Sequence, residues 1–161
     1  MNPLTGHAEM LQLVTFRLGG QKFAVDILKV QEIDNMKEIT QIPNSPPYLA
    51  GAINLRGKVI PVLSMSTKFG LADKTANELD KIVIMDIRGI IMGIIVDSVS
   101  DVLRISANVV EPPPPVSSTI SAKFIRGIAK LESELVILLD MDQLLNVDEQ
   151  HAVFGSTGAT A

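Results

Sequence analysis

The chain has 161 residues, of which 47% are hydrophobic and 20% are charged, and its formal net charge is −4. This composition supports a packed interior, in one domain or in two small lobes that share a core, and excludes global disorder. The acidic balance and the lack of Lys and Arg runs argue against a nucleic-acid partner. The absence of cysteine excludes disulfides, thiolate nucleophiles and thiolate metal sites, and it fits a cytoplasmic location.

No segment of the sequence predicts direct membrane insertion. The longest apolar run spans residues 89–96, and its eight residues fall well short of the roughly 20 that a membrane helix needs. Residues 1–10 lack the apolar core of a signal peptide. We therefore expect a soluble protein.

The beginning of the chain predicts a β-hairpin followed by an ambiguous segment. Residues 11–18 alternate between apolar and polar side chains, Gly19 and Gly20 supply a turn, and residues 21–26 return as the partner strand. Residues 27–33 fit either a helical turn or the start of a strand.

The stretch from residue 50 to residue 65 predicts a second β-hairpin, reached through an extended segment and a loop at residues 37–47. Residues 57–58 supply the expected tight reversal, and the second strand is rich in β-branched residues. Pro61 cannot donate to a sheet ladder, which predicts an edge position or a bulge for this strand. Arg56 is expected at the tip, either with its guanidinium free to meet a partner or as a solvated turn residue.

The second half of the chain predicts two more hairpins, at residues 81–96 and 124–139. The first is strongly apolar and turns at Arg88 and Gly89. Other segments expected from composition are a helical turn (66–70), a flexible loop (71–79), an alternating strand (97–105), a short helix (140–147) and loose tails (1–10 and 148–161).

Four consecutive prolines at residues 112–115 predict a stiff polyproline stretch. Such a stretch can be the ligand of a domain with an aromatic groove. A linker between two lobes is the favoured interpretation.

A weak internal repeat relates the two halves of the chain. Residues 51–65 match residues 127–141 without a gap, and residues 25–33 echo residues 96–102 with one gap. Two similar β-units of about five short strands each explain both echoes. Short strands with glycine turns favour small barrels over a parallel sheet, and a single sandwich stays open as the alternative.

The sequence offers no catalytic or metal-binding constellation. Its two histidines, His7 and His151, lie in the predicted tails, without a metal-ligand partner at useful spacing or a Ser/His/Asp arrangement. Asp97 and Asp101 are four residues apart, where paired carboxylates can do acid–base chemistry but turn capping or solvation is favoured. Phosphate loops and dinucleotide fingerprints are absent. We therefore expect a binding module without enzymatic activity.

Several long motifs occur in a fixed order along the chain. They are residues 23–33, then Gly51 with residues 54–57 and 61–62, then Gly93 with residues 96–102, and finally residues 138–140 in the last hairpin. Together they resemble the CheW family of bacterial chemotaxis coupling proteins, over about residues 11–147.

The resemblance implies a mainly β fold of two five-stranded SH3-like barrel lobes that share a hydrophobic interface. It implies a non-catalytic adaptor, without a cofactor, that joins a CheA-type histidine kinase to the cytoplasmic hairpin tips of chemoreceptors. The location that follows is the cytoplasm, at membrane-associated receptor arrays. A CheW-like adaptor of a pilus-motility or other chemosensory pathway is the alternative. A small-ligand-binding barrel or a hydrolase is the alternative from a different class, and it would need a cavity with convergent polar groups.

The resemblance also implies which residues contact each partner. The kinase-facing residues would be Val30, Glu32, Gly51 and Val116. The residues at or near the receptor groove would be Arg56, Ile82 and Val102. The two charged residues are the clearest candidates, since charges on apolar segments are rarely buried without a partner. Val30, Ile82 and Val102 lie in strand-like patterns and fit a core at least as well as a contact role, and the glycine can simply permit a backbone turn.

One position departs from the family pattern. The family usually has Asp after its Pro-Val pair, and this chain has Ser64 there. The corresponding place in the second half of the chain keeps Asp140.

Overall fold

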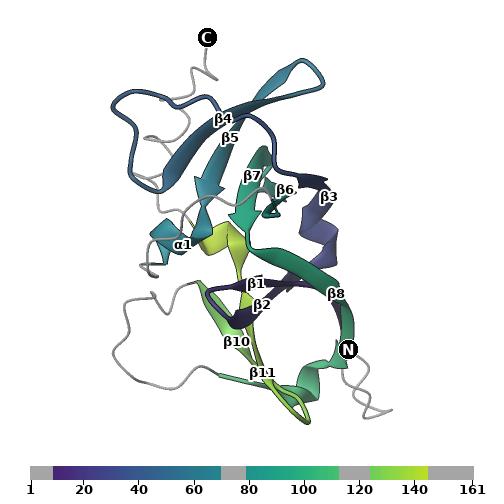
Figure 1. The fold of residues 1–161 in the computed structure, drawn as a ribbon. Coiled ribbons are helices and arrows are strands. Elements are labelled where there is room, and N and C mark those ends of the chain that lie inside the picture. Colours follow the sequence, from purple (N-terminus) through teal and green to yellow (C-terminus); the bar gives the residue numbers. More distant parts are fainter. Residues whose placement is uncertain (1–8, 70–78, 113–123, 145–161) are drawn as a thin grey trace.

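The computed structural model describes residues 9–69, 79–112 and 124–144, and this part of the chain is built almost entirely from β-strands (Figure 1). Its elements are, in chain order, β1 (Met10–Leu18), β2 (Gln21–Asp26), the 3-10 helix η1 (Ile27–Lys29), β3 (Val30–Asn35), β4 (Leu49–Leu55), β5 (Lys58–Ser64), α1 (Met65–Lys68), β6 (Lys81–Ile87), β7 (Ile90–Val96), β8 (Ser98–Ser106), η2 (Ala107–Val109), β9 (Val110–Glu111), β10 (Ile125–Lys130), β11 (Leu135–Leu139) and η3 (Met141–Gln143). Within the described ranges no helix has the length and apolarity that crossing a membrane requires.

All four predicted hairpins are confirmed, as β1–β2, β4–β5, β6–β7 and β10–β11. The ambiguous residues 27–33 contain both predicted structures, because η1 is followed directly by β3. The extended segment at residues 37–43 forms no strand, apart from one bridge between Thr40 and Ala52. Predictions that fall outside the described residues concern most of the loop at 71–79, the prolines 113–115, Val116, the end of the helix at 145–147, and residues 1–8 and 148–161, which include His7 and His151.

Two predictions about the central hairpin were wrong in detail. Its turn is formed by Arg56 and Gly57, which have φ angles of 51° and 86°, as expected for the two-residue turns that match the twist of a hairpin. Lys58 already belongs to β5. Pro61 does not lie on an edge strand, because β5 is flanked by β7 and β4. The register shift in the β4–β5 pairing lies between Leu49 and Gly51 on β4, opposite Leu63 and Val62, so the predicted bulge is near Pro61 but not at it. The proline is tolerated there because the pairing of β5 with β7 begins only at Val62.

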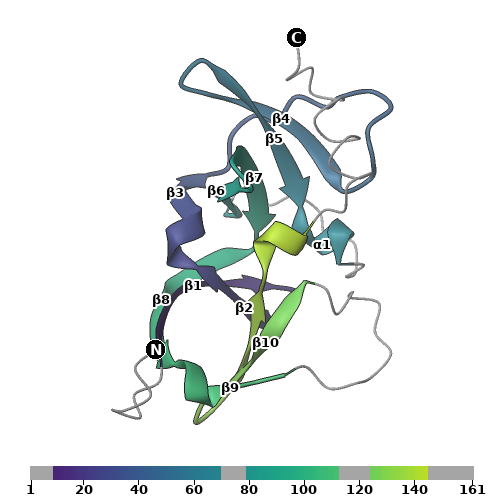
Figure 2. The ribbon, with the colours of Figure 1, turned by 180° about the vertical axis from the view of Figure 1, so that it is seen from behind.

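The strands form two sheets that occupy two lobes (Figures 1 and 2). Lobe A has the strand order β8-β1-β2-β11-β10-β9, and lobe B has the order β3-β6-β7-β5-β4. The prediction of two β-units is confirmed. Lobe A has six strands instead of five because the two-residue strand β9 adds to its edge.

The two lobes have the same strand order, but each combines strands from both sequence repeats. In each lobe one hairpin, β1–β2 or β6–β7, comes from one repeat and the remaining strands come from the other. In lobe A, β8, β1, β2, β11 and β10 occupy the places that β3, β6, β7, β5 and β4 occupy in lobe B. In lobe A, β2 pairs in parallel with β11, and in lobe B, β7 pairs in parallel with β5. Lobe B is therefore continuous over residues 30–96, whereas lobe A joins the first hairpin to the strands that follow residue 97.

Each sheet closes on itself where a glycine recurs in the repeat. In lobe A, β9 follows β8 through η2 and pairs with β10 at the other end of the sheet. In lobe B, Thr40 bridges Ala52 of β4. A Cβ atom on Gly51 would lie 2.2 Å from the Thr40 carbonyl oxygen, and one on Gly127 would lie 2.9 Å from the Glu111 carbonyl oxygen. The repeated glycines thus permit close approach of the segment that closes each barrel.

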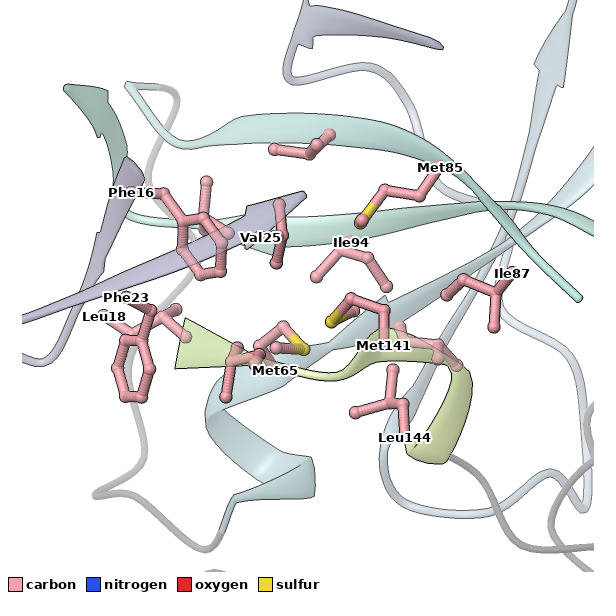
Figure 3. Packing of buried hydrophobic residues seen from close by; sticks show 14 of the residues in the cluster. Phe16, Leu18, Phe23, Val25, Met65, Met85, Ile87, Ile94, Met141 and Leu144 are labelled. Carbon is pink, nitrogen blue, oxygen red and sulfur yellow. The ribbon is translucent and has the colours of Figure 1, made fainter. Parts of the chain in front are cut away.

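Three clusters of buried side chains distinguish two barrels from a single sandwich. The interior of lobe A is formed by Leu11, Leu13, Ala24, Ile105, Ala129, Val136 and Leu138. The interior of lobe B is formed by Ile53, Leu55, Ile60, Val62, Ile82 and Ile84. A third, larger cluster, the shared core, receives side chains from both lobes, among them those in Figure 3: Phe16, Leu18, Phe23, Val25, Met65, Met85, Ile87, Ile94, Met141 and Leu144. A sandwich would contain only the cluster between its sheets.

The continuous apolarity of β6 follows from burial on both faces. Ile82 and Ile84 point into lobe B, whereas Val83 and Met85 belong to the shared core. A strand buried on both faces loses the usual alternation with polar residues.

The departure at Ser64 preserves a helix N-cap at this place of the repeat. The Ser64 hydroxyl caps α1 by accepting from the Thr67 N–H at 3.3 Å. Asp140 caps η3 in the same way, with Oδ1 3.1 Å from the Asp142 nitrogen. Serine and aspartate are both favoured at a helix N-cap, so the substitution preserves the role.

Candidate partner-binding surface

An ion pair joins β3 to the tip of the β4–β5 hairpin. Arg56 is the first residue of the hairpin turn. Its Nη2 donates to Glu32 Oε1, and its Nη1 donates to Glu32 Oε2 at 3.3 Å. This two-pronged geometry is the strong form of an Arg–carboxylate contact. The guanidinium that was expected to be free is therefore held within the chain, although 70% of the Arg56 side chain remains exposed.

The ion pair favours the charged form of both groups. The hydrogen bond from Arg56 holds the pKa of the Glu32 carboxyl below its usual value of 4.5, against the opposing effect of partial desolvation. The same contact raises the pKa of Arg56. Two residues along β3, Asp34 approaches Lys37 to 3.7 Å. This end of lobe B thus offers a partner closely spaced charges of both signs.

The shared core extends to the margin of lobe A through a row of paired residues. Val25 on β2 pairs with Val14 on β1, and Val14 pairs with Val102 on β8. The first two side chains are buried in the shared core, and Val102, on the edge strand, is 56% exposed. Val102 therefore lies at the margin of the junction between the lobes.

An equivalent row reaches the margin of lobe B. Ile94 on β7 pairs with Val83 on β6, which pairs with Ile33 on the edge strand β3. Ile94 and Val83 are buried in the shared core, and Ile33 is 42% exposed. The repeat aligns Ile33 with Val102, so the two lobes present corresponding residues.

Apolar side chains continue between these two margins. Ile27, Val30 and Val99 are half-buried and pack against the shared core. The edge strands β3 and β8 run along the same side of the molecule in both views (Figures 1 and 2). We call Ile27, Val30, Ile33, Val99 and Val102 the interlobe strip. A partly exposed apolar surface of this kind is typical of a protein interaction site.

The structure brings some of the predicted site residues together and separates others. Glu32 and Arg56, which were expected to face different partners, form one ion pair. Val30 and Val102 both belong to the interlobe strip. Gly51 is buried against Thr40, and Ile82 is fully buried inside lobe B, so neither presents an exposed side chain. Val116 lies outside the described residues.

Sequence reasoning missed three members of the interlobe strip, Ile27, Ile33 and Val99. For Ile33 the signal was available, since it occupies the place of Val102 in the internal repeat. No comparable signal marks Ile27 or Val99, because their half-burial depends on how the two lobes pack against each other.

A cavity beside η3 tests the small-ligand alternative. It has a volume of about 210 Å³ and is lined by Asp26, Lys29, Arg126, Leu139, Asp140, Met141 and Asp142. Most of its polar groups already serve the fold: Asp26 and Asp140 cap η1 and η3, and Lys29 forms an ion pair with Asp142 at 3.0 Å. The volume is also below the roughly 300–1,000 Å³ of typical ligand pockets. Across the described ranges, no cluster of three His, Cys, Asp or Glu side chains suits a metal ion.

Comparison with known proteins identifies the family. Residues 12–149 match the CheW-like domain. The probable chemotaxis protein CheW of Rhizobium etli is 35% identical over 143 residues, which cover 88% of this chain and 91% of the relative. The chemotaxis protein CheW of Klebsiella aerogenes is 31% identical over 153 residues, covering 95% and 92%. The crystal structure of the scaffolding protein TtCheW from Thermoanaerobacter tengcongensis is similar with a TM-score of 0.80 and 37% identity, covering 88% of this chain and 96% of that one. Sequence motifs, fold and relatives agree, and the chain belongs to the CheW-like domain family.

Proposed function

We propose that this chain is a non-catalytic adaptor of chemotaxis signal transduction, which joins the cytoplasmic tip of chemoreceptors to a CheA-type histidine kinase. The relatives named chemotaxis protein CheW and the scaffolding protein TtCheW support this role. The observation that carries it is the interlobe strip, an apolar surface contributed by both lobes, together with an exposed ion pair on the same edge strand β3.

The receptor tip is assigned to the interlobe strip. Val102 supplies exposed apolar area at the margin of lobe A, and Arg56 supplies charge at the hairpin tip. Ile82 lines the interior of lobe B beneath β3, where it pairs with Asp34, so its contribution is to the shape of the surface.

The kinase is assigned to the face of lobe B that carries Glu32. Val30, which the family resemblance adds to the kinase contacts, lies on β3 within the interlobe strip and so at the boundary between the two assigned surfaces. Gly51 shapes the kinase face by letting β4 approach Thr40 closely. Val116, which the family resemblance adds to the kinase contacts, remains an expectation.

The Glu32–Arg56 ion pair gives the two assigned surfaces a physical connection. A partner that draws Arg56 away from Glu32 leaves that carboxylate available to other donors, and a partner that engages Glu32 releases the guanidinium. Because each event changes the electrostatics of the other surface, binding of the two partners is expected to be coupled. Regulation then needs no covalent step in this protein, and the adaptor acts in the cytoplasm as a single unit over residues 11–147.

A binding titration against the purified regulatory domain of a CheA-type kinase from the same genome tests the proposal. The wild-type protein should bind saturably, and Glu32→Ala should weaken the affinity by about tenfold, as loss of a charged interface anchor typically does. Its melting temperature should change little, because the ion pair is exposed.

The matched control is Glu132→Ala, which removes an exposed acid in lobe A, far along the chain from β3, and should leave kinase binding unchanged. Failure of the wild-type protein to bind any such kinase of its organism would contradict the kinase assignment. A large fall in melting temperature with Glu32→Ala would show that Glu32 is structural.

A further inference from the structure

The turn η1 presents the most exposed large apolar side chain in the described part of the chain. Leu28 is 87% exposed, ahead of Leu79 at 73% and Val59 at 63%. A single exposed leucine requires no explanation by itself. Three further observations indicate that Leu28 contacts a partner. They concern the internal repeat, the anchoring of η1 and the surroundings of η1.

The barrel topology does not require η1. In the internal repeat, Asp26 corresponds to Asp97 and Val30 to Val99, and the gap falls between them: residues 27–29 separate the first pair, and Ser98 alone separates the second. The alignment is supported by the sheets, since pairing becomes irregular directly after Val30 and directly after Val99. The chain thus passes from hairpin to next strand without such a turn in one repeat, and adds two residues to present Leu28 in the other.

The added turn is firmly anchored. The Leu28 N–H donates to Asp26 Oδ1 at 2.9 Å. Lys29 Nζ lies 3.0 and 3.1 Å from the two carboxylate oxygens of Asp142, on η3. The Asp142 carbonyl in turn accepts from Arg88 Nε at 2.8 Å. Because these contacts hold the backbone of η1 in place, less backbone freedom is lost when a partner binds, which favours the use of Leu28 as a contact residue.

Leu28 also adjoins a surface that already has an assigned partner. Ile27 and Val30, on either side of η1, belong to the interlobe strip and pack against the shared core. In a 3-10 helix, residues three apart lie on one side, so Ile27 and Val30 face inward together and Leu28 is left pointing outward. The Leu28 side chain therefore protrudes into solvent at the border of the interlobe strip.

We propose that Leu28 is a further receptor-contact residue, whose side chain inserts into an apolar recess on the hairpin tip of a chemoreceptor docked across the interlobe strip. The inference rests on the proposed function, because the strip is the surface assigned there to the receptor. Continuity of Leu28 with the strip through Ile27, a residue to which no kinase contact is assigned, favours the receptor over the kinase as its occupant.

The test is a titration with a purified cytoplasmic signalling fragment of a chemoreceptor from the same genome. Leu28→Asn, which keeps the approximate size but removes apolarity, should weaken binding by about tenfold, a loss typical of a well-packed interface residue. Leu28→Met should restore most of the affinity. The melting temperature and the affinity for the kinase regulatory domain should equal those of the wild type.

The matched control is Leu135→Asn, which changes another exposed apolar residue, on β11 of lobe A, and should not alter receptor binding. Val102→Asn separates the two levels of the argument: if it weakens binding and Leu28→Asn does not, the receptor assignment stands and the role of Leu28 is refuted. A wild-type protein that does not bind the fragment refutes both. Three other results with Leu28→Asn would overturn the proposal. A fall in kinase affinity would assign Leu28 to the kinase, a fall in self-association would assign it to contact with a second copy, and a fall in melting temperature would assign it to the fold.

Discussion

At the scale of single residues, the Glu32–Arg56 pair combines an ordinary surface contact with an unusual position. The pair is exposed, and exposed ion pairs contribute little to stability, typically about 0–1 kcal/mol. Its position at the hairpin tip matters more, because 24 residues of chain separate the two partners. We therefore expect its removal to change binding much more than folding.

The pair predicts a pH dependence whose sign follows from Glu32. Because Arg56 lowers the pKa of Glu32 in the folded protein, the stabilisation from the pair is present above the ordinary value of 4.5 and is lost as the pH falls through the lowered value. Thermal unfolding of wild type and Arg56→Ala should differ slightly at neutral pH and converge at acid pH. Arg56→Lys, which keeps the charge, is the control. A difference that grows on acidification would contradict this linkage.

The main role of Gly51 is structural. It has a φ of +150°, and an added Cβ would meet the Thr40 carbonyl at 2.2 Å. Gly51→Ala should therefore lower the free energy of unfolding by about 3 kcal/mol, through backbone strain and overpacking, as measured by urea denaturation. Gly89→Ala is the matched control, since Gly89 also has a positive φ but has no atoms within 4 Å of the added Cβ. Equal losses in the two variants would contradict the close-approach explanation.

At the scale of elements, the edge strands β3 and β8 carry irregularities at corresponding places. Val30 pairs with Met85 and Glu32 with Ile84, so Gln31 is left without a partner. On β8, the pairing passes from Val99 to Val102 while only one residue intervenes on β1. Bulges of this kind bend an edge strand and discourage pairing with another chain.

Thr15, on β1, makes hydrogen bonds to Asp101 in the bulge of β8 from inside lobe A. It is fully buried, its hydroxyl lies 2.8 Å from Asp101 Oδ1, and the Asp101 N–H donates to it at 3.2 Å. Thr15→Val keeps the shape but removes the hydrogen bonds that the hydroxyl makes with Asp101, and it should cost about 1–3 kcal/mol in urea denaturation. Thr15→Ser, which keeps the hydroxyl, should recover part of this loss. An unchanged stability of the valine variant would show that water replaces the hydroxyl.

At the scale of the whole molecule, the shared core makes the two lobes one cooperative unit. Phe16 and Phe23 of lobe A and Met85 and Ile94 of lobe B are all nearly inaccessible to solvent in this cluster (Figure 3). Lobe A also depends on both ends of the described chain, so it cannot form before lobe B has been traversed. Neither lobe is expected to be stable alone.

Unfolding should therefore be a single transition. Met85→Ala, a truncation in lobe B, should destabilise the entire protein by about 2–5 kcal/mol and shift the transition of both lobes together. Hydrogen exchange of amides in β1 and in β6 would report the two lobes separately. Exchange in which β6 opens while β1 retains its protection would contradict the single cooperative unit.

The strands and their hairpins were determined by the sequence itself, because alternation of apolar residues and the chemistry of turns are local properties. The four hairpins, the apolar character of β6 and β7, and the repeat that underlies the two lobes were all predicted on that basis. The family motifs likewise drew attention to Glu32 and Arg56, whose predicted contacts with the kinase and the receptor stay predictions.

Only the tertiary structure decided how these parts combine. It placed the β1–β2 hairpin in the lobe built by the end of the chain, put Pro61 in an interior strand, joined Arg56 to Glu32 and buried Ile82 and Gly51. It also created the interlobe strip from η1 and two edge strands. The physical reason is the same in each case: burial and pairing depend on contacts between residues far apart in sequence, which local patterns do not encode.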